Sequence, residues 1–350
     1  MTAPARLRLL TAGESRGPAL VATLEGLPAG VPVTGRMVAA PLARRRLGYG
    51  RGARRTVERD DVTLLAGVRN GLSLGSPITV RAGTTEWPRW EKATAARVAL
   101  GAVVRSFVRE AAGIEIVSHV VELATARAPY GVYPTPADAE WLDADPVRCL
   151  DADASKAMVA EVDRAHRDGH ALGGVVEVLA YGVPVGLGSH GPADRRLDAR
   201  LSGALRGIRA VEGVEVGAGF ALAGGPGARA HDESGATAAG PRRSGGTEGA
   251  PSAGEPLRVR VAVKPVATVP RALATVDAAT GRAAAAHHRR SDVCAVPAAG
   301  IVAEATVALV LADVLLERFG GDSVAETRRK VRSSLEHPSV PWSAVRSCAG

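Results

Sequence analysis

Arginine is concentrated in one short segment, where its spacing between glycines suits the binding of an anion. Residues 42–54 read LARRRLGYGRGAR. Glycine lets backbone N–H groups approach a ligand closely, and the arginine guanidinium group forms paired hydrogen bonds to phosphate or carboxylate. The segment therefore predicts a site for a small polyanion, although a plain arginine-rich loop has the same composition and stays an alternative.

The whole chain shares this bias toward positive charge. Its formal net charge is +8 and its sequence pI is near 10.0, and arginine supplies nearly all of the positive charge. A basic surface favours anionic partners. Aromatic residues make up only 3% of the chain, too few for the stacking surface that proteins binding single-stranded nucleic acid use. We therefore expect a small anionic partner and no nucleic acid.

Features typical of metal sites, disulfide frameworks and membrane proteins are not found in the sequence. The three cysteines form no CxxC pair, so neither a metal site nor a disulfide framework is expected. The most apolar stretch, residues 298–316, is interrupted by Glu304 and Asp313, whereas a membrane span needs about 20 apolar residues. Charged residues also break residues 1–18, which do not resemble a signal peptide. We expect a cytoplasmic protein without a membrane anchor.

The elements that must position the arginine segment can be predicted from the spacing of apolar residues. A period of about 3.6 residues predicts three helices, over residues 94–112, 197–211 and 301–319. A fourth helix is predicted from its N-cap Thr34 to Leu47, and Pro41 should give it a bend or a late start. Strands are predicted from residue 6 to the turn at Gly13 and over residues 19–24, 114–123, 175–185 and 257–263.

These elements indicate one large domain of the α+β class. The chain has 350 residues and is 46% hydrophobic, so it can bury an extensive core. Its helices and strands do not alternate regularly as they do in βαβ folds. Residues 224–256 are rich in glycine, alanine, serine, proline and charge, which predicts a mobile loop. We therefore expect a domain at residues 1–330 that contains this loop, and a C-terminal tail at 331–350.

Several blocks of the sequence together resemble one known family. TAGES at residues 11–15, LARRRLGYGRGAR at 42–54 and RSDVCAVPAAG at 290–300 are similar to motifs of the chorismate synthase family. The similarity continues in order through GVRNGLSLGSPI at 67–78, LGGVVE at 172–177, RLDARL at 196–201, AHDE at 230–233 and KPVATVPRALATVD at 264–277. Long blocks in one order are more specific than any single short motif, and they extend over almost the whole chain.

The resemblance implies a fold, a reaction and a cofactor. Members of this family form a β-α-β sandwich, assemble as homotetramers and bind reduced FMN. They convert 5-enolpyruvylshikimate 3-phosphate to chorismate by an anti 1,4-elimination of phosphate and a ring proton, the last step of the shikimate pathway. Because the substrate carries a phosphate and two carboxylates, the arginine-rich segment would suit it as a clamp.

The resemblance also assigns roles to individual residues. Arg45 and Arg51 match positions that bind the anionic ligand, either the substrate or NADPH. Asp292 matches an aspartate that lies beside the flavin and helps it to take up the proton, although an aspartate there could simply cap a loop or helix. The positions that match flavin contacts of the family are Arg209, Ala210, Gly249, Lys264, Pro265, Val266, Ala267, Thr268 and Arg290.

The sequence departs from the family pattern at two places that concern proton transfer. The family's first block reads AGESHG, and Arg16 replaces its catalytic histidine, which is assigned the protonation of the reduced flavin. Arginine stays charged at neutral pH, so it keeps the positive charge and cannot donate the proton. In addition, TTEWPRWE at 84–91 runs directly into KATAARV at 92–98. The family has a long insert there, with a second catalytic histidine and an Arg-Ala-Ser run that holds the flavin.

The sequence therefore leaves three functions open. The first is a working chorismate synthase. The second is a catalytically impaired paralogue that binds an anionic ligand or joins a tetramer with an intact subunit. The third is an enzyme that acts on another anionic cyclohexene substrate.

Overall fold

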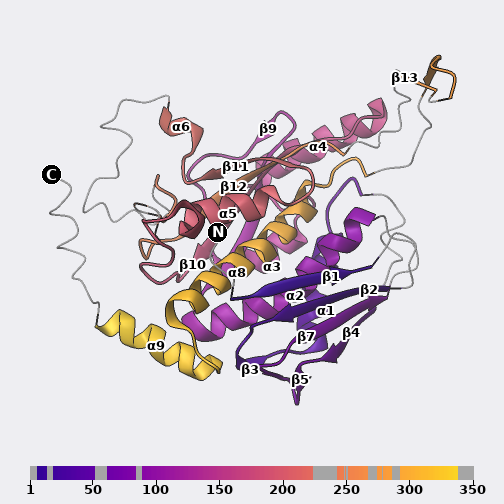
Figure 1. The fold of residues 1–350 in the computed structure, drawn as a ribbon. Helices are drawn as coiled ribbons and strands as arrows, with labels where there is room; N and C mark the ends of the chain where they lie inside the picture. Colours follow the sequence, from indigo (N-terminus) through magenta and orange to yellow (C-terminus); the bar gives the residue numbers. More distant parts are fainter. Residues whose placement is uncertain are drawn as a thin grey trace.

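A layer of helices lies between two antiparallel sheets, as Figure 1 shows. The computed structural model describes residues 6–13, 19–51, 61–83, 89–223, 243–247, 249, 251–266, 274–277, 279–285 and 292–337. The strand orders of the two sheets are β1-β2-β7-β4 and β11-β12-β10-β8-β9. This architecture confirms the expected α+β class and the β-α-β sandwich.

The first sheet contains four strands: β1 (Arg8–Ala12), β2 (Ala19–Glu25), β7 (Ile78–Gly83) and β4 (Asp61–Ala66). A smaller sheet is formed by β3 (Ala29–Pro32), β6 (Leu72–Leu74) and β5 (Val68–Arg69). Alternate side chains of a strand point to the same face, and Leu20, Ala22 and Leu24 of β2 are accordingly all buried. This face of the first sheet packs against the helices.

The second sheet contains five strands: β11 (Val211–Val216), β12 (Leu257–Val263), β10 (Gly174–Tyr181), β8 (Glu115–Leu123) and β9 (Ala126–Arg127). The apolar side chains of Val176 and Val178 in β10 are buried beside the helical layer. Glu177 alternates with them and lies between His119 of β8 and Arg260 of β12 in the strand register. One face of this sheet thus packs against the helices, and the other carries charged residues beside a small apolar cluster that contains Val117 and Leu179.

Three helices fill the space between the sheets: α1 (Gly35–Arg46), α2 (Arg89–Ala112) and α8 (Val296–Phe319). By length and composition α8 could span a membrane, but 78% of its most apolar window is buried inside the protein. A helix that is apolar on all sides and buried in this way is a core helix of the fold.

Glu304 is a charged residue of α8 inside this core. Its carboxylate accepts hydrogen bonds from Arg44 at 2.9 and 3.2 Å, from Arg105 at 2.8 Å and from the Ser118 hydroxyl at 2.7 Å. Burial alone would raise the pKa of Glu304, but the charges of Arg44, Arg105 and Arg148 lower it to about 2. The network therefore ties the arginine-rich end of α1 to α2, β8 and α8.

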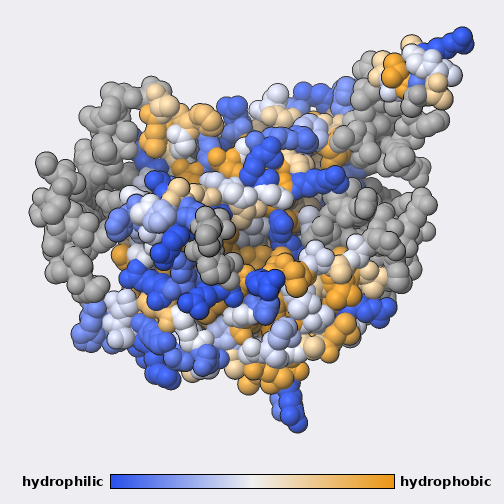
Figure 2. Space-filling view, in the orientation of Figure 1, coloured by the Kyte–Doolittle hydropathy of each residue, from blue (hydrophilic) through white to orange (hydrophobic). Residues whose placement is uncertain are grey.

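The remaining elements cover the outside of the sandwich: α3 (Ala139–Ala144), α4 (Ala152–Asp168), α5 (Leu197–Arg206), α6 (Phe220–Ala223), α9 (Val324–Glu336), the 3-10 turns Pro136–Asp138 and Ala193–Arg195, and the hairpin β13 (Ala274–Val276) and β14 (Ala283–Ala285). The hairpin projects from the body in Figure 1. Figure 2 shows mainly hydrophilic residues over α9, at the lower left of the view.

Several helix boundaries differ from the prediction. α2 and α8 begin at Arg89 and Val296, before the predicted starts at residues 94 and 301. α5 ends at Arg206, because the chain turns at Gly207 and Val211 is already the first residue of β11. α1 begins directly after Thr34, whose side chain accepts a hydrogen bond from the helix, so Pro41 does not delay its start.

The expected boundary at residue 330 is not a break in the structure. α9 runs through it, so residues 331–336 are helix and only the positions after them could form a tail. Ser323 caps the start of this helix, and Val331 is buried against the core, which holds its last turns in place.

The segment expected to be a mobile loop, residues 224–256, is packed in the part that the structure describes. Ser252 is fully buried, and its hydroxyl bridges the carbonyl of Pro184 at 2.5 Å and the N–H of Leu187 at 2.8 Å. The stretch near Ser252 is therefore an ordered turn. Residues 224–242, 248 and 250, where the rest of the expectation falls, lie outside the described residues.

Candidate active site

The arginine-rich segment leaves α1 through a sharp turn at two glycines. Gly48 and Gly50 have φ angles of +117° and +80°, which favour glycine over other residues. A Cβ atom at Gly50 would also lie 2.5 Å from Cγ1 of Val162 in α4. The carbonyl of Gly50 accepts a 2.8 Å hydrogen bond from the N–H of Val293. The glycines therefore let this segment lie directly against the block that contains Asp292.

This approach brings Arg51 and Asp292 together. Nη2 of Arg51 lies 3.7 Å from Oδ2 of Asp292, and the two side chains are only 5% and 9% exposed. Arg51 also donates to the carbonyl of Arg45. Its Nε atom is buried and has no hydrogen bond within the described part of the chain. The pair thus leaves a buried guanidinium donor that an anionic oxygen could accept.

Arg45 lies beside this pair and faces the start of α2. Its side chain is 4% exposed, and Nη1 donates to the hydroxyl of Thr94 at 3.2 Å. The junction at which the family carries its long insert directly precedes Thr94 in the sequence. A segment inserted there would therefore end close to Arg45.

Residues next to the start of β11 and the end of β12 form a second group. The N–H of Lys264 donates to the carbonyl of Ala210 at 2.8 Å. Ala210 has a φ angle of +72°, a strained conformation for alanine that the surrounding strands must hold. Nζ of Lys264 lies 2.5 Å from Glu212, and this hydrogen bond lowers the pKa of the Glu212 carboxyl. Arg209 is exposed next to these residues, so this surface carries two cations, of which Lys264 is paired with Glu212.

A short connection places the second group beside the first. The N–H of Leu172 donates to the carbonyl of Val293 at 2.7 Å. The next residue, Gly173, lies so close to Pro265 that a Cβ atom there would be 2.9 Å from the proline Cδ. Pro265 is exposed and Val266 half-buried. Predicted ligand-binding residues from widely separated parts of the sequence therefore meet on one side of the fold.

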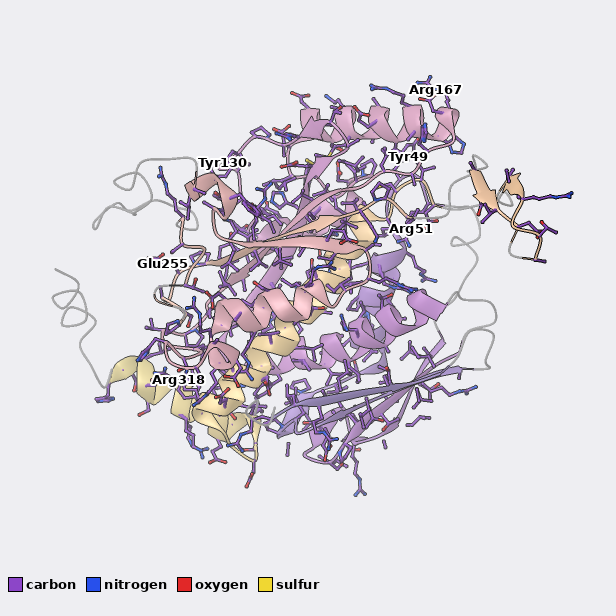
Figure 3. The ribbon with its side chains drawn as sticks, turned by 45° about the horizontal axis from the view of Figure 1, so that its top comes forward. Tyr49, Arg51, Tyr130, Arg167, Glu255 and Arg318 are labelled. Carbon is purple, nitrogen blue, oxygen red and sulfur yellow. The ribbon has the colours of Figure 1, made fainter. Side chains whose placement is uncertain are left out.

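Gly249 does not lie with these residues. Its turn is held at Leu187 and Pro184 through Ser252, and Gly249 itself is exposed with a φ angle of +60°. Figure 3 shows Tyr49 and Arg51 close together below Arg167 of α4, whereas Glu255, from the same turn region as Gly249, lies at the opposite side. The remaining predicted site residues fall outside the described part of the chain: Arg16, Ala267, Thr268 and Arg290.

Cys294 lies next to the ion pair but is not a candidate nucleophile. Burial raises the pKa of its thiol to about 12, so the reactive thiolate is scarce at neutral pH. Cys149 is also buried, and burial raises its pKa to about 11. Both thiols therefore act as small apolar core groups.

Two supporting contacts of the site were not predicted from the sequence. The hydroxyl of Tyr49 donates to Oδ1 of Asp163 at 2.8 Å, which ties the arginine-rich segment to α4. Glu304 holds Arg44, the residue before Arg45. The contact between Glu304 and Arg44 had a signal in the sequence, because a carboxylate inside an apolar helix requires a buried counter-charge.

Comparisons with known proteins identify the family. A family model described as chorismate synthase matches residues 7–93 and 90–316. A chorismate synthase from Streptomyces avermitilis is 64% identical over 388 aligned residues, covering 95% of this chain and 98% of that protein. One from Nocardioides sp. is 56% identical over 386 residues, covering 94% and 98%. The crystal structure of a chorismate synthase matches with a TM-score of 0.79 and 36% identity, covering 95% of this chain and 98% of that one.

The match is nearly complete but divided. Its two parts meet at residues 90–93, and the alignment with the Streptomyces avermitilis protein, at 388 positions, is longer than the 350 residues of this chain. That relative therefore holds residues that this chain lacks. Identity and coverage at this level are nevertheless far above what shared fold alone would produce. The chain belongs to the chorismate synthase family.

Proposed function

We propose that the chain carries out the chorismate synthase reaction, the anti 1,4-elimination of phosphate from 5-enolpyruvylshikimate 3-phosphate with the help of reduced FMN. The observation that carries this proposal is the buried pair of Arg51 and Asp292 beside Arg45. It combines donors for an anionic substrate with a carboxylate that can hold a proton, in a site shielded from water.

The geometry of Arg51 supports an anionic ligand in particular. A buried N–H group without a hydrogen bond is unfavourable by about 1–3 kcal/mol, and more when the group is charged. The Nε atom of Arg51 is in this state within the described residues. A phosphate or carboxylate oxygen would accept from it in the paired manner typical of arginine. The ligand at Arg45 and Arg51 would be the substrate, or the phosphate of NADPH.

The second group of residues fits the flavin phosphate. Arg209 and Lys264 are cationic and exposed, and Ala210 is half-buried between them. When bound, reduced FMN would supply electron density to the reacting ring and take up its proton. Arg45 and Arg51 would hold the anionic groups of the substrate. Asp292 would hold a proton at its carboxylate, which the ion pair with Arg51 orients.

A second candidate function is a catalytically impaired member of the family that binds an anionic ligand or joins a tetramer with an intact subunit. Two observations support it. Arg16 stands where the family has a proton-donating histidine, and the family match is divided at residues 90–93, directly before Thr94. The arginines would still bind the anion in such a protein, whereas both protonation steps would be slow.

We also propose a homotetramer located in the cytoplasm, as the family implies. Exposed leucines on the first sheet and its neighbour support an association of subunits: Leu10, Leu65, Leu72 and Leu74.

Chorismate formation from 5-enolpyruvylshikimate 3-phosphate and reduced FMN, followed without oxygen, tests both functions. A working enzyme should show turnover that Asp292→Asn abolishes or strongly reduces. An impaired member should bind phosphate and show no turnover. Failure to bind phosphate would contradict both functions.

A further inference from the structure

The dipeptide Leu172-Gly173 joins the two groups of the site. Its first residue donates its N–H to the carbonyl of Val293, next to Asp292, and forms a parallel bridge with Cys294. Its second residue lies against the chain between Val263 and Pro265. No side chain of this dipeptide is among those that the family resemblance assigns to a ligand.

The contact at Gly173 leaves no room for a side chain. A Cβ atom would lie 2.5 Å from the carbonyl oxygen of Val263, 2.9 Å from Cδ of Pro265 and 3.0 Å from its nitrogen. Real Cβ atoms essentially never come closer than 3.0 Å to such atoms, so the chain at Pro265 would have to move. The carbonyl of Gly173 is itself held by the N–H of Ala124 at 3.0 Å, which keeps the glycine from moving instead.

Val293 extends this arrangement to the arginine-rich segment. Its carbonyl accepts from Leu172 at 2.7 Å, and its N–H donates to Gly50 at 2.8 Å. The backbone therefore runs as a ladder from Gly50 through Val293 to Leu172, and Gly173 adds the close contact with Pro265. Each step is fixed by a main-chain hydrogen bond or by a contact with no free space.

We propose that Leu172-Gly173 is a positioning element that sets the distance between Asp292 and the segment 264–266. This inference rests on the proposed function, because that segment is where the flavin would bind. The dipeptide acts through Val293 and Pro265 and touches neither ligand. Gly174 differs from it, since a Cβ atom there would meet the carbonyl of Glu122 at 2.2 Å and so disturb the pairing of β10 with β8.

The variant Gly173→Ala tests this role, because the added Cβ atom should force the segment at Pro265 away from residue 173. Reduced FMN should then bind roughly tenfold or more weakly, because shifts of about 1 Å in a binding group have effects of this size. The affinity for inorganic phosphate, which should bind at Arg45 and Arg51, should change by less than about twofold. Gly213→Ala is the matched control, since its Cβ atom would meet only Ala262 at 3.4 Å in the same sheet. Equal flavin affinity in both variants would overturn the proposal.

Hydrogen exchange separates this proposal from the proposed function. If the wild-type chain binds no reduced FMN, the flavin part of the proposed function is wrong. Gly173→Ala should then still speed the exchange of the Lys264 amide, which is bonded to Ala210, relative to Gly213→Ala. An unchanged rate would overturn the positioning role. If Gly173→Ala does not fold, hydrogen exchange of the wild-type chain with and without reduced FMN tests the proposal. Flavin bound at 264–266 should slow the exchange of the Leu172 amide as well as that of the Lys264 amide, and an effect on Lys264 alone would overturn the positioning role.

Discussion

The guanidinium group of Arg51 lies 3.7 Å from the carboxylate of Asp292, and both side chains are almost completely buried. Removing two charges from water is unfavourable, and their attraction offsets this only when the geometry and the remaining hydrogen bonds are good. Here the distance is long for a hydrogen bond, and Nε of Arg51 has no hydrogen bond among the described residues. We therefore interpret the pair as part of a ligand site and not as a stabilising contact.

Arg51→Ala should weaken the binding of inorganic phosphate by about 1.5–3 kcal/mol, at least roughly tenfold, because charge-assisted hydrogen bonds contribute this much. The phosphate affinity of Arg51→Lys should lie between those of the wild type and Arg51→Ala, since lysine keeps the charge and loses the paired donors. Arg8→Ala provides a control of equal charge change, because Arg8 is exposed and pairs with Glu25. Calorimetric titration at fixed salt measures all four proteins. Similar losses in Arg51→Ala and Arg8→Ala would indicate a non-specific effect of net charge.

Tyr49→Phe should loosen the arginine-rich segment, because it removes the 2.8 Å hydrogen bond to Asp163 and leaves the ring in place. The side chain is 43% exposed, so we expect a modest loss of phosphate affinity, on the order of twofold. Tyr181→Phe is a matched control, since its hydroxyl donates to the carbonyl of Pro134, also at 2.8 Å, away from the site. If the two variants bind phosphate equally well, Tyr49 has no role in the site.

Glu304→Gln should lower the free energy of unfolding at neutral pH by about 3–5 kcal/mol, because it removes the buried negative charge that Arg44, Arg105 and Arg148 share. The pKa of Glu304 in the folded protein, about 2, lies below its ordinary value of 4.5. The ionised group therefore stabilises the fold above about pH 4.5, and this contribution is lost as the pH falls toward 2. Denaturant unfolding at several pH values should show the difference between variant and wild type shrinking over this range.

The exposed carboxylate of Glu25 provides the control for this experiment. It pairs with Arg8 at 3.4 Å and both side chains are at least half exposed, so Glu25→Gln should change stability little at any pH. A pH-independent difference between Glu304→Gln and wild type would mean that Glu304 is not ionised in the folded protein.

Much of the fold could be predicted because it depends on local spacing. The period of apolar residues indicated β8 and β12 with nearly their observed limits. It also indicated the ends of α2 and α8, whose observed starts lie before the predicted ones. The same reasoning extended α5 too far, because Ile208 and Val211 continue its apolar spacing although the chain turns at Gly207 and pairs with β12 from Val211 onward. Periodicity does not distinguish a helix from a turn followed by a buried strand.

The site could be predicted only in part. The motif blocks indicated Arg51 and Asp292 as functional residues, and the structure places them together. Which side chains support them depends on contacts between distant segments, such as Tyr49 with Asp163, and no local pattern carries that information. The position of Gly249 apart from the other residues of the expected flavin site follows from the packing of its turn and could not be read from a motif.

The last prediction concerns recovery of the two proton donors. Arg16→His restores the histidine that the family resemblance implies at this position. Inserting, between Glu91 and Ala93, a family segment that carries the second histidine restores the other donor. The two donors act at separate steps, so each recovery should raise chorismate formation independently. A general acid contributes roughly 10²-fold or more, about 2.7 kcal/mol of barrier. The protein with both changes should therefore exceed either single variant by about this factor.

Four proteins compared side by side decide the matter: the unmodified chain, Arg16→His, the insertion and the combination. By the family resemblance, the inserted segment would carry the Arg-Ala-Ser run that holds the flavin, so the insertion should also strengthen the binding of reduced FMN. The segment would end close to Thr94, whose hydroxyl accepts a hydrogen bond from Arg45. Near-normal turnover by the unmodified chain would show that water or another residue supplies both protons, and the argument from the missing histidines would be wrong. Equal failure of all four proteins, with phosphate binding intact, would instead mean that Arg45, Arg51 and Asp292 now serve a different anionic ligand.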